Sequence, residues 1–508
     1  MDFSIIFRMP PMLDWLSLFL LALFIFLVIL ISEIIRKKLN WSQEITRKIV
    51  HVSVGIPMLL TLILLETAFP LILISTFFTI FNYIAVRKNL FPAMHIDRYN
   101  LGTVYYPLSF LILVIIFWSI SKIFIFAAVM VMAFGDGAAA IAGRCVNNPH
   151  QYKLIHDQKS LEGTLVMFLV STICIFLTFI FYPSLISIWS HGLAKLLLFA
   201  VLTAIISTAA EALGHRGNDN LLVPLTTSIV LFYLLHATND QVFQFVLGMV
   251  LGAVVSVVSI KFNFLSPSGS VATFILASII FGFGGWSWAI PILAFFILSS
   301  LLSKMGKSRK ARYDLIFEKG SKRDYGQVFA NGGIAVLLMV SSLFLNDPRI
   351  YLLYLGALAA AMADTWSTEI GILFGKTPRH ILKWTKVPAG SSGGVTFYGF
   401  LGGFLGAIIL AFIGSIFFHD SLKENSITFI FLITIAGFYS SIVDSLLGAT
   451  VQVQYRCLNC NMITEKKFHC PDNQGITHRG FEWISNDMVN FINTIFGALT
   501  VYVGILLI

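Results

Sequence analysis

The chain has 508 residues, of which 57% are apolar and only 12% are charged, and its formal net charge is +9. A soluble domain carries about a quarter charged residues, so this composition excludes an ordinary soluble protein and indicates one that is embedded in a membrane. Period-2 alternation of apolar residues is not sustained, which argues against a β-barrel. The basic segments are short and lack interleaved aromatic residues, so we expect no nucleic-acid partner.

Apolar runs of about 16 to 24 residues recur from Leu16 to Leu507, each long enough to cross a bilayer as a helix. They predict an all-α polytopic membrane protein with roughly sixteen transmembrane helices, arranged as two parallel-repeat halves of about eight. The first run, Leu16–Ile31, lacks a basic leading region and a cleavage site, so we expect a helix there and not a signal peptide. The halves span residues 1–238 and 239–508, on either side of the short polar seam His236–Gln241.

The distribution of basic residues predicts the orientation. With an outer N-terminus and alternating helices, all Lys and Arg residues fall in or beside inner loops except Arg8, Lys122, Lys195, Arg349 and Lys423. Two inner loops are long, Lys304–Arg323 and Arg456–Asn486. The polar motifs described next all belong to inner helix ends, so we expect active sites on the cytoplasmic face.

The first half carries an ordered series of polar motifs. "RKIVH" begins an inner helix, "LGTVYYPLSF" precedes the fourth helix, "AFGDGAAA" places an acid in a small-residue helix, and "KSLEGT" forms a glycine turn. A second acid and an Asn-Asp-Asn run follow. Carboxylate and amide oxygens are ligands that suit Mg²⁺, and a lysine beside a glycine turn suits phosphate. The candidate residues are Arg47, Lys48, His51, Asp136, Lys159, Gly163, Glu211, Asn218, Asp219 and Asn220.

The second half repeats this order. "YGQVFANGGI" matches the segment before the fourth helix, and an acidic helix, a glycine turn "AGSSGGVT", a second acid and an Asn-Asp pair follow. The two acids lie 75 residues apart in the first half and 80 in the second. A carboxylate inside a membrane helix is costly, so its recurrence at matching places favours a metal and phosphate role. The candidates are Asp364, Glu369, Ser391, Ser392, Gly393, Gly394, Asp444, Asn486, Asp487 and Asn490.

Three of the five cysteines fall in the loop 456–486. "CLNC" supplies Cys457 and Cys460, and His469 and Cys470 follow as an adjacent pair, with His478 as an alternative ligand. CxxC with a later His and Cys has the character of a structural zinc site, and a loop on the cytosolic side disfavours a disulfide. The remaining Cys145 and Cys174 are interpreted as packing residues.

The first half resembles the phytol kinase and dolichol kinase family of CTP-dependent polyprenol kinases. The resemblance covers Arg47 to Leu235 and rests on "RKIVH", "GDGAAAIAGR", "KSLEGT" and "EALGHRGNDNLLVPL". It implies that Lys159, Ser160, Glu162 and Gly163 bind CTP, with Asp136, Glu211 and Asp219 in the metal and phosphate layer. The second half, from Asn263 to Leu499, resembles the phytyl-phosphate kinase family through "ADTWSTEIG", "VPAGSSGGVTFYG", "DSLLGATVQ" and "WISNDMVNF".

Together the two resemblances imply a bifunctional kinase for isoprenoid salvage. The first half would phosphorylate a membrane-embedded prenyl alcohol such as phytol, geranylgeraniol or farnesol with CTP and Mg²⁺, and the second would convert the monophosphate to the diphosphate with CTP, ATP or another nucleotide. His51 or Asp136 would serve as the base, and an oligomer is compatible with the sequence. The competing interpretations are a CTP-dependent lipid cytidylyltransferase and a secondary transporter.

Overall fold

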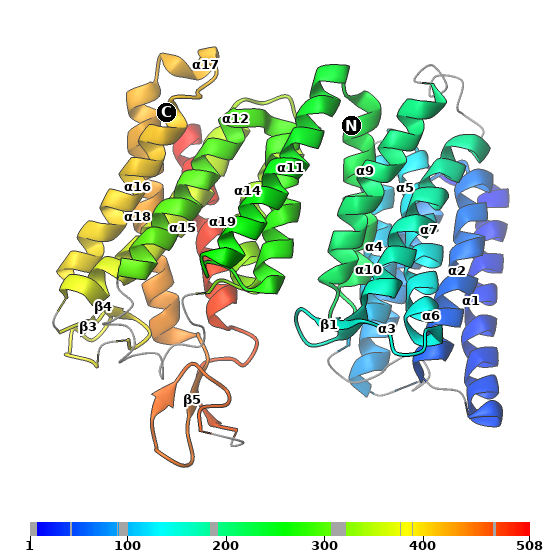
Figure 1. The fold of residues 1–508 in the computed structure, drawn as a ribbon, viewed down its shortest axis with the longest axis horizontal. Helices are drawn as coiled ribbons and strands as arrows, with labels where there is room; N and C mark the ends of the chain where they lie inside the picture. Colours follow the sequence, from blue (N-terminus) through cyan, green and yellow to red (C-terminus); the bar gives the residue numbers. More distant parts are fainter. Residues whose placement is uncertain are drawn as a thin grey trace. The chain divides into compact units, whose positions relative to one another are not determined.

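The computed structural model describes residues 8–40, 43–88, 90, 100–182, 192–305, 322–375, 377–388, 390–470 and 474–508, with only the backbone for residues 43–45 and 47. Most of the predicted basic loop Lys304–Arg323, residues 306–321, therefore lies outside the described residues. The chain divides into two compact units, unit 1 (Met1–Thr238) and unit 2 (Asn239–Ile508). Each unit is a bundle of helices whose axes are roughly aligned (Figure 1).

The prediction of an all-α polytopic membrane protein is confirmed. Among the described residues, 13 helices are long and apolar enough to cross a membrane, and two shorter apolar helices, Lys48–Leu64 and Gly102–Phe117, accompany them. The 39-residue helix α12 (Pro267–Met305) is interrupted at Gly285, whose φ of 63° and ψ of −154° are not helical. Glycine tolerates this conformation because it has no Cβ, so α12 consists of two consecutive helices.

Unit 1 is built around the helix that carries Asp136. This helix consists of α5, a π-helical turn η1 and α6. In its apolar stretch of 18 residues 72% of the residues are buried, the same share as in α15 of unit 2. The helical segments of unit 1 are α1 (Met12–Leu39), α2 (Gln43–Leu64), α3 (Phe69–Lys88), α4 (Gly102–Phe117), α5 (Ile123–Met130), η1 (Val131–Gly135), α6 (Asp136–Cys145), α7 (Leu161–Phe181), α9 (Leu193–Ala212) and α10 (Asp219–His236).

Unit 2 is built around α15, which packs against α12, α14, α16, α18 and α19. Its small and branched side chains from Ala357 to Ala363 are fully buried, so α15 forms the centre of the apolar core. The helices of unit 2 are α11 (Asn239–Lys261), α12, α14 (Tyr325–Ser342), α15 (Arg349–Phe374), α16 (Phe397–Ser415), α17 (Asp420–Lys423), α18 (Ser426–Thr450) and α19 (Asn486–Leu507).

Short antiparallel strands connect some of these helices. In unit 1, β1 (Gln151–Lys153) pairs with β2 (Gln158–Ser160) immediately before α7. In unit 2, β3 (Arg379–His380) pairs with β4 (Gly394–Val395) just before α16. A three-stranded sheet of order β6-β5-β7 lies between α18 and α19, and its strands are β5 (Gln454–Arg456), β6 (Ile463–Thr464) and β7 (Ile476–Arg479).

Candidate functional site

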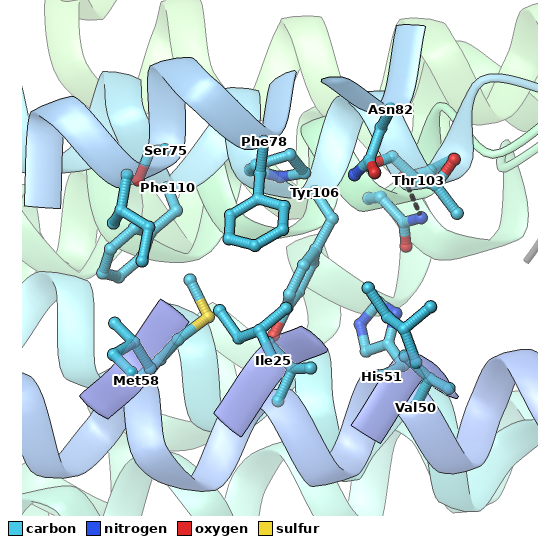
Figure 2. A pocket seen from close by; sticks show the side chains of 17 residues that line it. Ile25, Val50, His51, Met58, Ser75, Phe78, Asn82, Thr103, Tyr106 and Phe110 are labelled. Carbon is cyan, nitrogen blue, oxygen red and sulfur yellow. Dashed lines mark hydrogen bonds between the residues drawn. The ribbon is translucent and has the colours of Figure 1, made fainter. Parts of the chain in front are cut away.

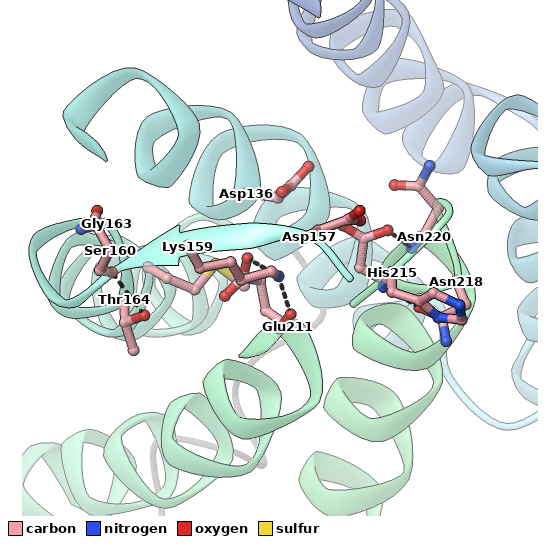
Figure 3. Close-up of polar contacts among 12 residues, drawn as sticks. Asp136, Asp157, Lys159, Ser160, Gly163, Thr164, Glu211, His215, Asn218 and Asn220 are labelled. Atoms are coloured by element: carbon pink, nitrogen blue, oxygen red, sulfur yellow. Dashed lines mark hydrogen bonds and ion pairs between the residues drawn. The ribbon is translucent and has the colours of Figure 1, made fainter. Parts of the chain in front are cut away.

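Two lysine–carboxylate pairs lie at one end of unit 1, and Figure 3 shows one of them, Lys159 with Glu211. The Nζ atom of Lys48, on α2, contacts the carboxylate of Asp136, which is only 3% exposed at the start of α6. The Nζ atom of Lys159 lies 2.5 Å from Oε1 of Glu211, near the end of α9, and also donates to the backbone carbonyl of Glu211. A carboxylate buried among membrane helices needs such a partner, because leaving it unpaired is strongly unfavourable.

The position of Lys159 follows from the hairpin that ends in α7. Lys159 is the residue before Ser160, whose hydroxyl caps α7 by accepting a hydrogen bond of 3.1 Å from the amide of Gly163. Burial by itself lowers the pKa of Lys159, but the negative charges of Glu211, Asp219 and Asp136 outweigh it, so the pKa is raised. Lys159 is therefore protonated at neutral pH and is a fixed cation among three acids.

The loop between α9 and α10 brings the predicted Asn-Asp-Asn run to the same end. Asn218 accepts a 2.7 Å hydrogen bond from the amide of His215, which stabilises the turn, and Asp219 begins α10. The side-chain amide of Asn220 donates to the carbonyl of Gly102 at 2.8 Å, so α10 is tied to the first residue of α4. Asp157 of the hairpin accepts from the amide of Arg216, which joins the hairpin to this loop (Figure 3).

An apolar pocket opens beside this polar end, between α1, α2, α3 and α4 (Figure 2). It contains about 800 Å³ of empty space, its open side included. Leu, Ile, Val, Met and Phe side chains line most of it. Its polar lining residues are His51, Ser75, Asn82, Thr103, Tyr106 and Asn220.

His51 and Tyr106 lie together at the polar part of this pocket, with ring centroids 4.1 Å apart. The charge of Asp136 acts on Tyr106, so the pocket and the lysine–carboxylate pairs are neighbours. Asn82 donates to the carbonyl of Thr103 at 2.8 Å and holds α3 against α4. Asn82, Thr103 and Tyr106 were not among the predicted site residues, although Thr103 and Tyr106 belong to the segment "LGTVYYPLSF".

Two predicted residues of the first site, Glu162 and Arg47, are not seen in contact with the lysine–carboxylate pairs. Glu162 accepts hydrogen bonds from the backbone amide of His150 at 3.1 Å and contacts its Nδ1 atom at 2.7 Å, so it holds the entrance of the hairpin. Its carboxylate is thus engaged away from Lys159. Arg47 lies on α2 one residue before Lys48, but its side chain is outside the described part of the chain.

In unit 2 the two predicted acids contact each other. The carboxyl groups of Asp364, on α15, and Asp444, on α18, are hydrogen-bonded to one another. Glu369 is buried further along α15, where it accepts a 2.6 Å hydrogen bond from Ser303 and interacts with the charge of Arg323. Burial lowers the pKa of Arg323 to about 10, which still leaves it protonated at neutral pH. Two carboxyl groups in contact need a shared proton or a cation.

The segment Ser391–Gly394, a predicted phosphate seat, lies ahead of α16 and is tied to its neighbours by hydrogen bonds. Ser392 donates to Glu465 at 2.6 Å and accepts from Gln454 at 3.0 Å, and the amide of Gly394 donates to the carbonyl of Ser391 at 2.9 Å. Gly393 has a φ of 77° and packs against Ala449 of α18. Ser392 and both glycines therefore have structural partners, and the backbone of Ser391 takes part in the same turn.

By its contacts, the residue of unit 2 that corresponds to Gly163 is Gly399. The sequence comparison of the two halves instead aligns Gly163 with Gly393 and Gly394, which lie a few residues earlier. Thr396 caps α16 by accepting from the amide of Gly399 at 3.0 Å, as Ser160 does with Gly163. A Cβ added at Gly163 would lie 3.0 Å from the carbonyl oxygen of Ala139, three residues after Asp136. One added at Gly399 would lie 3.0 Å from that of Ser367, three residues after Asp364. Both units thus repeat one contact between an acidic helix and the next.

The start of α19 holds the second predicted cluster of oxygen ligands. Ser485 caps this helix by accepting from the amide of Met488 at 3.5 Å, and Asn486 and Asp487 occupy the first turn. Asn490 follows one turn later and is partly buried. Asn493, which was not predicted, is buried and donates to the carbonyl of Ala360 at 3.2 Å, so it fixes α19 against α15.

The described residues differ in how they suit metal ions. The ligand atoms of Cys457, Cys460, His469 and Cys470 all lie within 4.8 Å of one another, and among the described residues this is the one such convergent group of His, Cys, Asp and Glu. The acids of unit 1 do not converge in this way, and Asp136 and Glu211 each contact a lysine. Their donor chemistry still fits Mg²⁺, which commonly takes one or two carboxylates and completes its shell with nucleotide phosphates and water.

Comparison with known proteins gives one family match and several relatives. The family "Integral membrane protein DUF92" matches residues 250–498. Protein PGR of Arabidopsis thaliana is 30% identical over 278 residues, which is 50% of this chain and 94% of that protein. A phytol kinase of Synechocystis is 31% identical over 220 residues, covering 42% of this chain and 90% of the relative.

A more distant relative, Protein VTE6 of Arabidopsis thaliana, is 22% identical over 240 residues, 46% of this chain and 63% of that protein. No solved structure matches the chain. The identity to the phytol kinase and to Protein PGR extends over nearly the full length of those proteins, which is more than a shared motif. The chain belongs to a phytol kinase-like family of integral membrane proteins, and its residues 250–498 match the DUF92 family of integral membrane proteins.

Proposed function

We propose that this protein phosphorylates a prenyl alcohol in unit 1 and the resulting monophosphate in unit 2. The observation that carries the proposal is the junction in unit 1 between an apolar pocket and a buried set of lysines and acids. A prenyl alcohol has a long apolar chain and one hydroxyl, and a phosphate donor is strongly anionic. The two parts of the junction suit these two chemistries.

The pocket supports a prenyl chain as the acceptor. Its walls come from Leu21, Ile25 and Ile29 of α1 and from apolar side chains of α2, α3 and α4. The outward side of α1 is exposed and apolar, so the pocket belongs to the part of the unit that would face lipid. A hydroxyl at the polar part of the pocket would lie beside His51 and Tyr106.

The lysines support a nucleotide as the donor. Lys159 and Lys48 are largely buried cations, and phosphoryl transfer depends on positioning and on neutralising the charge that develops on the transferred group. The phytol kinase resemblance points to CTP as the donor. Asp136, Glu211 and Asp219 would hold Mg²⁺, which would supply further positive charge to the nucleotide phosphates.

His51 is the better placed of the two predicted bases. It lines the pocket, whereas Asp136 is paired with Lys48. In the proposed reaction the alcohol oxygen attacks the terminal phosphorus of the nucleotide, the bond to the nucleoside diphosphate breaks, and the hydroxyl proton passes to His51. The products are the prenyl monophosphate and the nucleoside diphosphate.

Unit 2 would perform the second transfer at a site that, among the described residues, has fewer lysines beside its acids than the site of unit 1. The position that Lys159 holds before the helix cap is occupied by Val395, and Asp364 and Asp444 contact each other directly. A divalent cation shared by these two acids, with Asp487 as a further candidate ligand, would offset their charge and suit two phosphate-bearing substrates. The donor in this unit would be CTP, ATP or another nucleotide.

The test is the product pattern of the purified full chain in detergent. We expect a radiolabelled prenol with CTP and Mg²⁺ to give the monophosphate first and the diphosphate later, with release of CDP. Phytol, geranylgeraniol, farnesol and a dolichol would be compared, each with CTP and with ATP. Release of pyrophosphate and formation of a CDP-lipid would instead identify a cytidylyltransferase, and absence of any phosphorylated prenol would contradict the proposal.

A further inference from the structure

The described residues between α18 and α19, 451–470 and 474–485, form a small unit that we call the cysteine module. It contains the sheet β6-β5-β7 and projects from one end of the bundle of unit 2 (Figure 1). Within it, Nδ1 of His469 lies 3.5 Å from Sγ of Cys460 and 3.6 Å from Sγ of Cys470. Cys457 completes the group, and its side chain is buried. Four ligands at these separations fit a tetrahedral ion with metal–sulfur bonds of about 2.3 Å.

The backbone around Cys457 is shaped to present the sulfur atoms. The amides of Asn459 and Cys460 donate to Sγ of Cys457. Cys457 in turn accepts from the amide of Asn461 at 3.0 Å through its carbonyl, and Asn461 has a φ of 56°. This tight turn places the two cysteines of the CxxC segment side by side while the amides point toward sulfur. The thiols are free and form no disulfide in the described part of the chain.

The cysteine module has little apolar core of its own. Several large apolar side chains are exposed, and the buried ones are few. The exposed residues are Leu458, Met462, Ile463, Phe468, Ile476, Phe481 and Trp483. A segment of this size that cannot bury enough apolar surface usually needs a metal or disulfides to fold.

We propose that Cys457, Cys460, His469 and Cys470 bind one structural Zn²⁺ that holds the cysteine module together. The thiols and the imidazole are ligands that zinc prefers, and all four positions are filled by protein, which is typical of a structural and not a catalytic site. The alternative ligand His478 is on β7 and is not one of the convergent group. This inference does not depend on the proposed kinase activity.

The module also contacts the loop that precedes α16. Glu465, next to β6, accepts from both Ser392 and Gln452, and Gln454 of β5 donates to Ser392. Arg479 of β7 donates to the carbonyl of Gly448 at 2.9 Å, near the end of α18. Zinc would therefore stabilise, through the module, the segment Ser391–Gly394 and the end of the helix that carries Asp444.

The test is the metal content of the full-length protein purified without added metal or chelator. We expect about one zinc per chain by mass spectrometry of the metal. Cys460→Ser and His469→Ala should lose most of it, and Cys145→Ser, which changes a cysteine of unit 1, should keep it. Because a variant can fail to fold, the native protein would also be treated with a chelator and then with Zn²⁺. Chelation should make residues 457–480 sensitive to protease, and Zn²⁺ should reverse this.

Two results would overturn the proposal. One is native protein without zinc in which Cys457, Cys460 and Cys470 react with a thiol reagent while the module resists protease. The other is a Cys457–Cys460 disulfide found by peptide mass spectrometry in protein that was purified under reducing conditions. The additional expectation that chelation slows the second phosphorylation rests on the proposed function, and its failure alone would leave the metal site intact.

Discussion

Lys159 and Val395 occupy the same position in their units, one residue before the hydroxyl that caps the next helix. This single difference changes the charge of the two sites. In unit 1 a lysine contacts the second acid, Glu211, whereas in unit 2 the second acid, Asp444, contacts the first acid directly. We infer that unit 1 neutralises phosphate with its own lysines, while unit 2 depends more heavily on a divalent cation.

Replacing Lys159 with methionine should abolish most of the first phosphorylation. The change keeps the length of the side chain but removes the buried cation, and loss of one group that stabilises a transition state costs about 10²–10³-fold in rate. Lys153→Met is the matched control, because Lys153 lies in the same hairpin and is exposed. Initial rates of monophosphate formation would be measured for both, and equal rates would show that Lys159 is structural.

Neutralising the acid of each unit should separate the two steps. Asp136→Asn should prevent phosphorylation of the alcohol but leave phosphorylation of added monophosphate intact, and Asp364→Asn should let monophosphate accumulate. Chromatography of labelled prenyl phosphates distinguishes these patterns. If either folded variant lost both activities, the two units would not hold independent sites.

Single residues show how far the sequence could predict the site. Asp136 and Glu211 were found because charged residues in apolar helices are costly and therefore conspicuous, and Lys159 was found because it stands beside a glycine turn. The pairing of these acids with lysines was not predicted, because Lys48 and Asp136 are 88 residues apart in the sequence and Lys159 and Glu211 are 52 residues apart. Tyr106 was missed because an aromatic residue in a membrane helix has no local mark that distinguishes a pocket wall from lipid contact.

At the scale of elements, the recurring feature is the close contact between the acidic helix and the capped helix that follows it. Gly163 of α7 meets Ala139 of α6, and Gly399 of α16 meets Ser367 of α15. Small residues let the backbones of membrane helices approach closely. This contact fixes the distance between the acid and the hairpin in each unit.

Adding a methyl group at these glycines should loosen the contact. We expect Gly163→Ala and Gly399→Ala to destabilise the protein by about 1–3 kcal/mol, because the new Cβ would crowd a backbone carbonyl. Gly333→Ala is the control, since a Cβ there would lie 3.9 Å from its nearest neighbour, Phe491, and helical alanine is favourable. Thermal unfolding midpoints in one detergent would be compared, and an unchanged midpoint for Gly163→Ala would contradict the proposed contact.

Elements also show why parts of the fold were not predictable. Apolar length alone predicted the membrane helices, since a bilayer imposes it. The strand pairs before α7 and α16 were not predicted, because β1 to β4 are only two or three residues long. The alignment of Gly163 with Gly393 and Gly394 has a related cause. The capping pairs Ser160–Gly163 and Thr396–Gly399 are defined by hydrogen bonds, which the sequence does not show, whereas the adjacent glycines Gly393 and Gly394 are conspicuous in the sequence.

At the scale of the whole molecule, two compact units lie in one chain. If each unit completes one transfer, the monophosphate made by the first is released into the same membrane in which the second works. Covalent linkage raises the effective concentration of the intermediate near the second unit. The two activities should nevertheless be separable.

Complementation tests this independence. Asp136→Asn and Asp364→Asn proteins, reconstituted together in one population of proteoliposomes, should convert a prenol to its diphosphate although neither does so alone. The rate should be lower than for the native chain, because the intermediate must diffuse between molecules. If the mixture makes no diphosphate while each variant keeps its own step, the intermediate must pass within a single chain and free diffusion in the bilayer is insufficient.

The π-helical turn Val131–Gly135 lies immediately before Asp136 and holds one residue more than a regular turn would. Each residue advances an α-helix by about 100°, so this extra residue sets the angular phase between α5 and the acid. Deleting Ala133 would let the helix close regularly while rotating Asp136 away from Lys48. The same rotation would move Ala139 away from Gly163, so such a chain should lose both stability and its first step. Because Val131, Met132, Ala133 and Gly135 are buried, the turn should tolerate neither larger side chains nor a change of length.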